Sequence, residues 1–312
     1  MIFSLIFVKI MSSIKMVQPL YEDGPDHQEK AGTPSMGGIS FLLVSIFYSI
    51  AYVGDQITTG FVIVLTLFAL IGLIDDVMKI TKKNNEFGLS PKQKLFLQTL
   101  FGLITLYYMN VVSPELFDSV NFFGLKLSIG QGLPFIIYII FLLFLFVGIS
   151  NATNLTDGLD GLLTSNMIIT LASLFFVTTT KQIYGATELV VIIMICLMGF
   201  FFINKNPSLI FMGDVGSLSL GALIVYFSII LDCEVFLLFF GFVYFLETLS
   251  VILQVTYFKY TKKKTGTGKR LLLMAPLHHH IEKKGKSEKE VVKLFNKVQI
   301  GICILGLVIY FV

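Results

Sequence analysis

The chain has 312 residues, of which 55% are hydrophobic and only 14% are charged, and its mean hydropathy is +0.84. Typical soluble domains carry charges at roughly 25% of positions, so this composition excludes a soluble enzyme and a disordered chain. The net charge of only +3 excludes a general basic surface for nucleic acid. Three cysteines, Cys196, Cys233 and Cys303, lie far apart and offer no disulfide framework or zinc motif. The composition therefore predicts a membrane protein with many spans.

Apolar runs that match the thickness of a bilayer recur along the whole chain. A helix needs about 20 apolar residues to cross, and the first run, Met1–Val17, is too short and too basic for a full span. Nine further spans are predicted near residues 37–53, 61–80, 95–112, 133–150, 162–178, 187–203, 215–231, 235–258 and 298–312. We expect a single integral membrane domain, 1–312, of the all-α class.

The basic residues are divided very unevenly among the segments between these spans. The odd-numbered segments, counted from the N-terminus, carry all 23 Lys and Arg residues except Lys126 and Lys181. Because Lys and Arg are enriched in cytoplasmic loops, the odd-numbered segments are predicted to face the cytosol. The C-terminus is then expected outside.

Acidic residues and all four histidines gather in the same predicted cytoplasmic segments. They are His27, Asp75, Asp76, Asp157, Asp160, Asp214, His278, His279 and His280. A transporter more often places ionisable groups near the middle of the bilayer. Groups at the membrane boundary instead suit an enzyme that joins one lipid to one soluble substrate.

Two acidic motifs suggest a cation site. Asp75 and Asp76 lie near the end of a predicted helix. They could be a solvated pair of carboxylates beside Lys79, or they could bind a hard cation or act as a base. Asp214 opens another span, where an N-cap is the plain alternative to a metal ligand. With the other acids on the same side, Asp214 is the preferred metal ligand and Mg²⁺ the expected ion. A Walker lysine loop is absent from the sequence.

The strongest local pattern is the run from Asn151 to Gly161, which follows a wholly apolar span. Asn154, Asp157 and Asp160 recur every three residues, so a helix would place them on roughly one face. Gly158 allows a close approach of the backbone. A simple turn does not need three polar groups at helical spacing, so this run is predicted to have a functional role.

Three further segments carry weaker signals. The glycine-rich run 32–38, preceded by Lys30, could bind phosphate through backbone N–H groups or could be a plain loop. Three consecutive histidines, 278–280, cannot all point at one ion, so phosphate contact or proton transfer fits better. Glu247 and Gln254 share a helical face, which favours a buried polar pair that holds helices together.

Taken in this order, the motifs resemble the phospho-N-acetylmuramoyl-pentapeptide transferases, the MraY family of the polyprenyl-phosphate N-acetylhexosamine-1-phosphate transferase superfamily. The resemblance runs from about Asp23 to the C-terminus. The segments that carry it are Lys30–Gly38, Asp75-Asp76, Asn154–Gly161, Phe211–Asp214 and Pro276–His280. The acidic motifs are shared across the superfamily, whereas the histidine segment points to this family.

The resemblance implies about ten transmembrane helices, the first truncated or short, both termini outside, and a cytoplasmic active-site cleft in the inner (plasma) membrane. It implies an Mg²⁺-dependent transfer of phospho-MurNAc-pentapeptide from UDP-MurNAc-pentapeptide to undecaprenyl phosphate, giving lipid I and UMP for peptidoglycan synthesis. The oligomeric state stays open, a homodimer included.

The resemblance also implies roles for individual residues. Asp214 corresponds to the magnesium ligand, Asp75 to the proposed base with Asp76 beside it, and His279 to a catalytic residue that contacts the sugar-peptide side together with Gln254. The implied nucleoside-binding wall consists of Lys30, Ser35, Asn154, Asp157, Gly158, Asp160 and Phe211. The implied substrate contacts also include His278 and His280.

Other readings stay open from the residues alone. A related enzyme that transfers GlcNAc-1-phosphate, a transporter of nucleotide-sugar solutes and a membrane scaffold would share much of this pattern. For the transferase, direct attack by the lipid phosphate and a covalent aspartyl intermediate are both compatible with the sequence.

Overall fold

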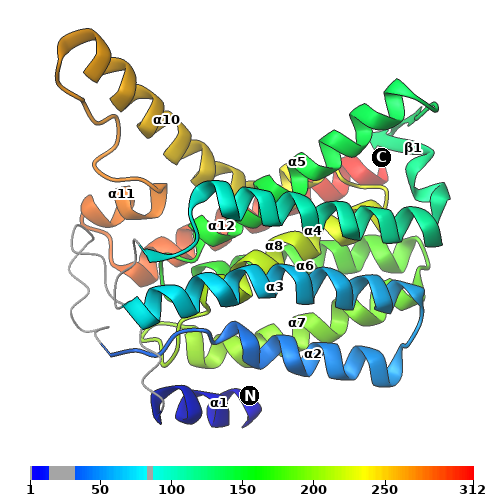
Figure 1. The fold of residues 1–312 in the computed structure, drawn as a ribbon, viewed down its shortest axis with the longest axis horizontal. Coiled ribbons are helices and arrows are strands. Elements are labelled where there is room, and N and C mark those ends of the chain that lie inside the picture. Colours follow the sequence, from blue (N-terminus) through cyan, green and yellow to red (C-terminus); the bar gives the residue numbers. More distant parts are fainter. Residues whose placement is uncertain (1, 14–31, 83–86) are drawn as a thin grey trace.

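The computed structural model describes residues 2–13, 32–82 and 87–312, and nearly all ordered structure in them is helical (Figure 1). The helices are α1 (Ile2–Ser13), α2 (Gly38–Tyr52), α3 (Gln56–Lys82), α4 (Pro91–Val112), α5 (Leu133–Thr156), α6 (Leu162–Thr180), α7 (Tyr184–Asn204), α8 (Gly213–Ile230), α9 (Leu237–Phe240), α10 (Phe242–Thr265), α11 (Leu277–Lys283) and α12 (Glu288–Phe311), with a 3-10 turn at Pro114–Phe117.

Seven helices in the described ranges are long and apolar enough to cross a membrane. They are α3, α4, α5, α6, α7, α8 and α12, while the apolar α2 is shorter, with 15 residues. The predicted class, an all-α multi-pass membrane protein, is confirmed. The expected total of about ten spans stays a prediction.

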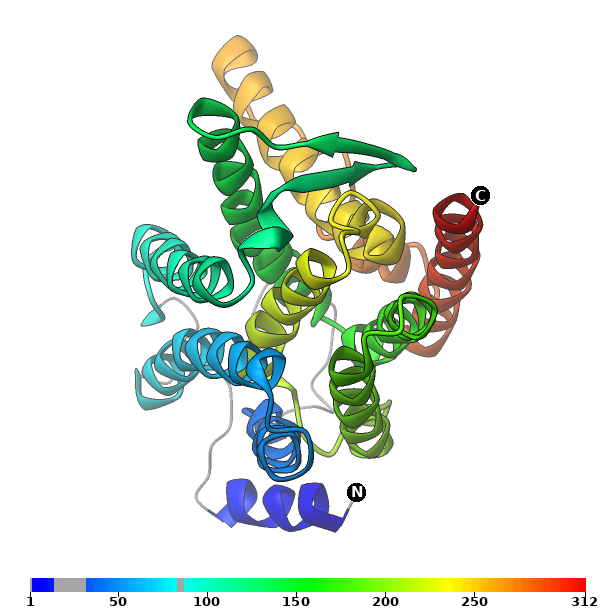
Figure 2. The same ribbon diagram turned by 90° about the vertical axis from the view of Figure 1, so that its right-hand side faces the viewer.

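Helix α8 forms the centre of the bundle, as the end-on view shows (Figure 2). Every residue of α8 is buried, whereas the surrounding helices also expose apolar side chains on their outer faces. Glycines permit the closest contacts: a Cβ on Gly72 of α3 would lie 2.2 Å from the Asp214 backbone. The two helices therefore bring Asp214 directly against the acidic end of α3.

The predicted span 235–258 is not one continuous helix. The chain breaks at Gly241, between α9 and α10, and α10 then continues to Thr265 and leans away from the bundle (Figure 1). The apolar run passes through Gly241 without interruption, so hydropathy alone could not locate the break. Helix α10 extends beyond the apolar run because its last residues are polar residues that do not break a helix.

A β-hairpin between α4 and α5 was also not predicted. Strands β1 (Ser119–Phe122) and β2 (Leu125–Ser128) pair antiparallel, joined by Phe123 and Gly124, both with positive φ. The backbone N–H of Asn121 donates to Asp232 Oδ1 at 3.0 Å, which ties the hairpin to the loop after α8. Four-residue strands leave too short a pattern to recognise in sequence.

Candidate functional site

Three buried carboxylates from two helices converge at one end of the bundle. Asp75 and Asp76 come from the last turns of α3 and Asp214 from the first turn of α8. Each contributes an oxygen atom to a group whose members all lie within 4.8 Å of one another. Gly213, with φ +77°, precedes Asp214 and leaves room for Asp76 Oδ2, which a Cβ there would approach to 2.6 Å. This group could hold a metal ion.

Two lysines offset part of this negative charge. Lys79 Nζ lies 2.5 Å from Asp75 Oδ2 and 3.2 Å from Asp214 Oδ2. Lys94 Nζ lies 3.1 Å and 2.8 Å from the same two oxygens. A capping box between Ser90 and Gln93 fixes the start of α4 and so positions Lys94. From the sequence, Lys79 is expected only as a neighbour of a solvated pair of carboxylates. No local pattern points to Lys94.

The chemistry of this donor set suits a hard cation. Asp76 Oδ2 accepts the backbone N–H of Val215 at 3.2 Å, whereas Asp76 Oδ1 is buried and has no hydrogen-bond partner among the described residues. A buried, unpaired carboxylate oxygen is costly unless a cation or donor satisfies it. Carboxylate oxygens are also the protein ligands that Mg²⁺ prefers. The residues therefore fit a divalent cation.

The loop between α5 and α6 divides the predicted polar face into separate roles. Helix α5 ends at Thr156, so Asn154, Asp157 and Asp160 do not lie on one helical face and that prediction is wrong. The glycines that follow favour a turn, and Gly161 adopts a left-handed conformation. Burial raises the pKa of Asp157 well above its usual value, and the charges of Asp214 and Asp76 raise that pKa further. Asp157 is half-buried and responds to the charge of these carboxylates, but it is not one of the three whose oxygens lie within 4.8 Å of one another.

Asp160 is instead occupied by protein contacts. Its carboxylate accepts the backbone N–H of Ser208 at 3.0 Å and the Asn206 amide at 3.3 Å, and its own N–H donates to Glu288 Oε1. These bonds join the α5–α6 loop, the α7–α8 loop and the start of α12. The sequence interpretation did not include Glu288, because a pairing across 128 residues leaves no local pattern.

The histidine triplet opens α11, and each of its rings meets a different neighbour. His278 is fully buried, its backbone N–H and its Nδ1 both engage the Glu247 carboxylate, and its Nε2 has no hydrogen-bond partner among the described residues. Nε2 lies against Gly158, where a Cβ would come within 2.3 Å. Glu247 thus does join two helices, but through His278 rather than Gln254.

The other two histidines and Gln254 have local partners. His279 Nδ1 lies 2.8 Å from Glu282 Oε2, and His280 Nδ1 accepts the N–H of Leu273 at 3.1 Å. Slight burial and nearby Lys284 lower the pKa of His280. Gln254 Oε1 accepts two backbone N–H groups, from Leu271 and Leu272. This side chain therefore shapes the loop that leads to the histidines.

The glycine-rich segment packs beside the start of α8. Phe211 N–H donates to Pro34 O at 2.9 Å, and Gly37 and Gly38 donate to the carbonyls of Phe211 and Met212. Ser35 is buried and Phe211 is half-buried. Lys30, also predicted to bind substrate, lies outside the described residues, as does His27.

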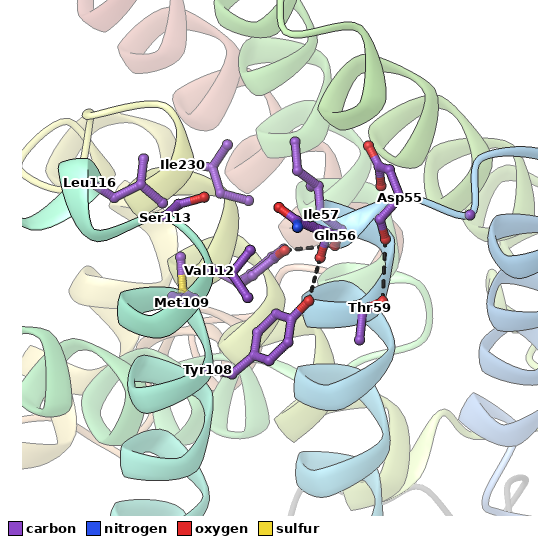
Figure 3. A pocket seen from close by; sticks show the side chains of 12 residues that line it. Asp55, Gln56, Ile57, Thr59, Tyr108, Met109, Val112, Ser113, Leu116 and Ile230 are labelled. Carbon is purple, nitrogen blue, oxygen red and sulfur yellow. Dashed lines mark hydrogen bonds between the residues drawn. The ribbon is translucent and has the colours of Figure 1, made fainter.

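A cavity of about 620 Å³ lies at the opposite end of α3. Its lining includes Asp55, Thr59, Tyr108 and Ser113, and Figure 3 shows Tyr108 bonded to the Gln56 carbonyl at its edge. None of the predicted site residues contributes to this cavity. The candidate site is therefore the acidic end, where the last turns of α3 meet the start of α8.

Comparisons with known proteins agree with this location. The model of the family described as "Glycosyl transferase family 4" matches residues 58–232, more than half of the chain, and includes all three clustered carboxylates. The pattern described as "Phospho-N-acetylmuramoyl-pentapeptide-transferase signature 1" matches residues 30–42.

Curated relatives match over most of the chain. The phospho-N-acetylmuramoyl-pentapeptide-transferase of Streptococcus agalactiae serotype Ia is 46% identical over 87% of this chain and 81% of its own length. The proteins of the same name from Streptococcus uberis and Streptococcus equi subsp. zooepidemicus are 45% and 43% identical. The first of these two covers 87% of this chain and 81% of the relative, and the second covers 93% and 87%. This chain therefore belongs to the phospho-N-acetylmuramoyl-pentapeptide-transferase family.

Proposed function

We propose that this protein transfers phospho-MurNAc-pentapeptide from UDP-MurNAc-pentapeptide to undecaprenyl phosphate, forming lipid I and UMP. The observation that carries the proposal is the buried group of Asp75, Asp76 and Asp214 in a member of this family. Lys79 and Lys94 form ion pairs with this group. The active site then faces the cytosol in the plasma (inner) membrane, and the C-terminus lies outside.

The cation that this group would hold is Mg²⁺. Asp214 is the proposed ligand, and the unpaired Oδ1 of Asp76 is available beside it. Bound there, Mg²⁺ supplies charge stabilisation for a pyrophosphate and its leaving group. Lys79 and Lys94, which contact Asp75 and Asp214, would lie beside the ion and could contact phosphate oxygens of the substrates.

The chain's own residues position the reacting groups and hold a proton. Asp75 Oδ1 accepts the Leu89 N–H at 2.6 Å, which fixes the carboxylate, and we assign Asp75 as the base that keeps the lipid phosphate ionised. An oxygen of that phosphate attacks the β-phosphorus of the donor, and the bond from this phosphorus to the UMP oxygen breaks. Catalysis then rests on positioning and electrostatic stabilisation.

The donor's remaining groups are assigned to the surrounding residues. Asn154, Asp157, Gly158, Ser35, Phe211 and Lys30 are proposed to contact the nucleoside and its phosphates. His279 and His280 are proposed to face the sugar and peptide, with His279 closest to the reaction, and the buried His278 to support the backbone at Gly158. We propose Asp160 and Gln254 as residues that shape these walls through the loops they hold.

The direct test is product formation by the purified protein in detergent. With radiolabelled donor, undecaprenyl phosphate and Mg²⁺, the proposal predicts a labelled lipid and an equal amount of UMP. A transporter or scaffold would give neither product. Formation of labelled phosphoenzyme in the absence of lipid acceptor would replace direct attack with the covalent route.

A further inference from the structure

The far half of α10 projects from the helical bundle, and the loop that follows it packs back against it. After Ser250 the helix leaves the bundle (Figure 1), and in the fully described stretch from Val251 to Thr265 only Thr261 is buried. The side chains left exposed there are largely apolar or aromatic at first. They include Ile252, Leu253, Val255, Tyr257, Phe258 and Tyr260.

Basic residues follow these apolar ones directly. The sequence has no Asp or Glu between Glu247 and Glu282, yet this interval carries six basic residues, which we call the basic cluster. The cluster consists of Lys259, Lys262, Lys263, Lys264, Lys269 and Arg270, all exposed. None of the six forms an ion pair with another residue that the structure describes.

The chain after α10 folds back and keeps the basic cluster together. Gly266 ends the helix with φ +77°, and the N–H of Lys269 donates to Thr261 Oγ1 at 2.8 Å. Gly268 lies so close to the Phe258 ring that a Cβ would come within 2.4 Å of it. Lys269 and Arg270 therefore return beside the last turns of the helix, where Lys264 Nζ lies 5.8 Å from the centre of the Tyr260 ring.

An apolar helix that ends in unpaired basic residues suits the boundary between lipid tails and headgroups. Tyrosine is enriched at this depth, and amphipathic helices with a basic side are attracted to anionic lipids. Basic groups beside a transmembrane segment bind anionic headgroups, with each residue worth about a fivefold gain in affinity.

We propose that the basic cluster binds the headgroups of anionic phospholipids of the phosphatidylglycerol type. These lipids are neither donor nor acceptor in the proposed reaction, so the proposal stands apart from the transferase assignment. The bound lipids would hold the projecting end of α10 at the membrane surface.

The chain contains no tryptophan, so a Tyr260→Trp variant of the full-length protein carries a single fluorescent reporter at the cluster. The variant is placed in vesicles of phosphatidylcholine and phosphatidylglycerol in equal amounts, with either one or the other lipid brominated to quench fluorescence. We expect brominated phosphatidylglycerol to quench at least about threefold more strongly. High salt should reduce this preference, because exposed charges are screened.

Matched charge removals make the test specific. In the Tyr260→Trp background, Lys262→Gln, Lys263→Gln and Lys264→Gln together should bring the two quenching values close to equality. The control combines Lys283→Gln, Lys284→Gln and Lys286→Gln, which removes the same charge from exposed positions at and beyond the end of α11, and should retain the preference.

Two results would overturn the proposal. One is equal quenching by the two lipids before any lysine is replaced. The other is loss of the preference when a few mole per cent of undecaprenyl phosphate is added, because the cluster would then be a site for the acceptor lipid. Neither result bears on whether lipid I is formed.

Discussion

Asp214 lies where the two lysines and the two carboxylates of α3 meet, so its charge bears on every other group in the site. Asp214→Asn keeps the shape of the side chain but removes the anionic ligand. We expect kcat to fall by at least about 100-fold and the response to added Mg²⁺ to be lost. The measurement is the rate of lipid product formation across a magnesium titration.

A carboxylate at the other end of the molecule serves as the control for this change. Asp55 caps the start of α3 through Thr58, and Asp55→Asn retains that cap, so its kcat should equal that of the unsubstituted protein. If Asp214→Asn kept both turnover and the normal magnesium dependence, the metal assignment would be wrong.

Glu247 accepts the backbone N–H of His278 and contacts its ring Nδ1, and so aims Nε2 of the buried imidazole at Gly158. In Glu247→Gln an amide N–H can replace the accepting oxygen, which forces the ring to accept at Nδ1 and to carry its proton on Nε2. Loss of a bond to a charged group should lower kcat about tenfold. Steady-state kinetics with the UDP donor measure this effect.

Glu234 is an equally buried carboxylate, bonded to Tyr138 at 2.5 Å. Glu234→Gln therefore controls for the general effect of replacing a buried carboxylate by an amide. This variant should leave kcat unchanged. Equal losses in both variants would indicate general damage to packing rather than a role for Glu247 in positioning His278.

At the scale of the elements, the contact between α3 and α8 sets the geometry of the site. In Gly72→Ala the new methyl group would lie 2.2 Å from the Asp214 backbone, so the helices must separate. Overpacking of this kind costs about 1–3 kcal/mol. We expect a lower temperature of half-inactivation and a loss of turnover even below that temperature.

Gly148 of α5 provides the matched helical glycine, because a Cβ there would meet nothing within 4 Å. Gly148→Ala should leave activity intact and leave stability unchanged or slightly improved, since alanine favours the helix. The account of the α3–α8 contact fails if the two variants behave alike.

Sequence reasoning located most helices, because a span must be both apolar and about 20 residues long, and such runs stand out. It missed the break at Gly241 and the end of α5 at Thr156. The apolar run continues through Gly241, although the helix breaks there. The regular spacing of polar residues continues past Thr156, although α5 ends there. It also missed the hairpin, whose strands are only four residues long.

The candidate site was predictable where its chemistry is local. The acidic motifs and the histidine triplet are recognisable within a few consecutive residues. Lys94 and Glu288 act across 120 and 128 residues, and such pairings are set by helix packing. The same holds for Asp160, whose loop contacts could not be inferred from its spacing to Asn154.

At the scale of the whole molecule, the basic residues predict how the protein sits in the membrane. In a background without the native cysteines, Thr59→Cys should react with an impermeant thiol reagent added to intact cells. Lys286→Cys should react only after the cells are opened. Both side chains are exposed or near the surface, so access is decided by sidedness. The reverse pattern would refute the orientation.

Substrate choice is the property that separates this enzyme from its nearest alternative. The segment from Lys259 to Lys297 carries twelve basic residues and the histidine triplet. UDP-GlcNAc needs little beyond a nucleotide and pyrophosphate site, whereas a pentapeptide extends further and carries carboxylates. Rim charges of this kind orient a ligand more than they add affinity.

The most direct measurement is therefore the rate of lipid product formation with UDP-MurNAc-pentapeptide and with UDP-GlcNAc, in the same preparation with undecaprenyl phosphate and Mg²⁺. The account predicts rapid turnover of the first donor and little of the second. It also predicts that His279→Ala damages the reaction while leaving UMP binding largely intact. Comparable rates with both donors would contradict the assignment.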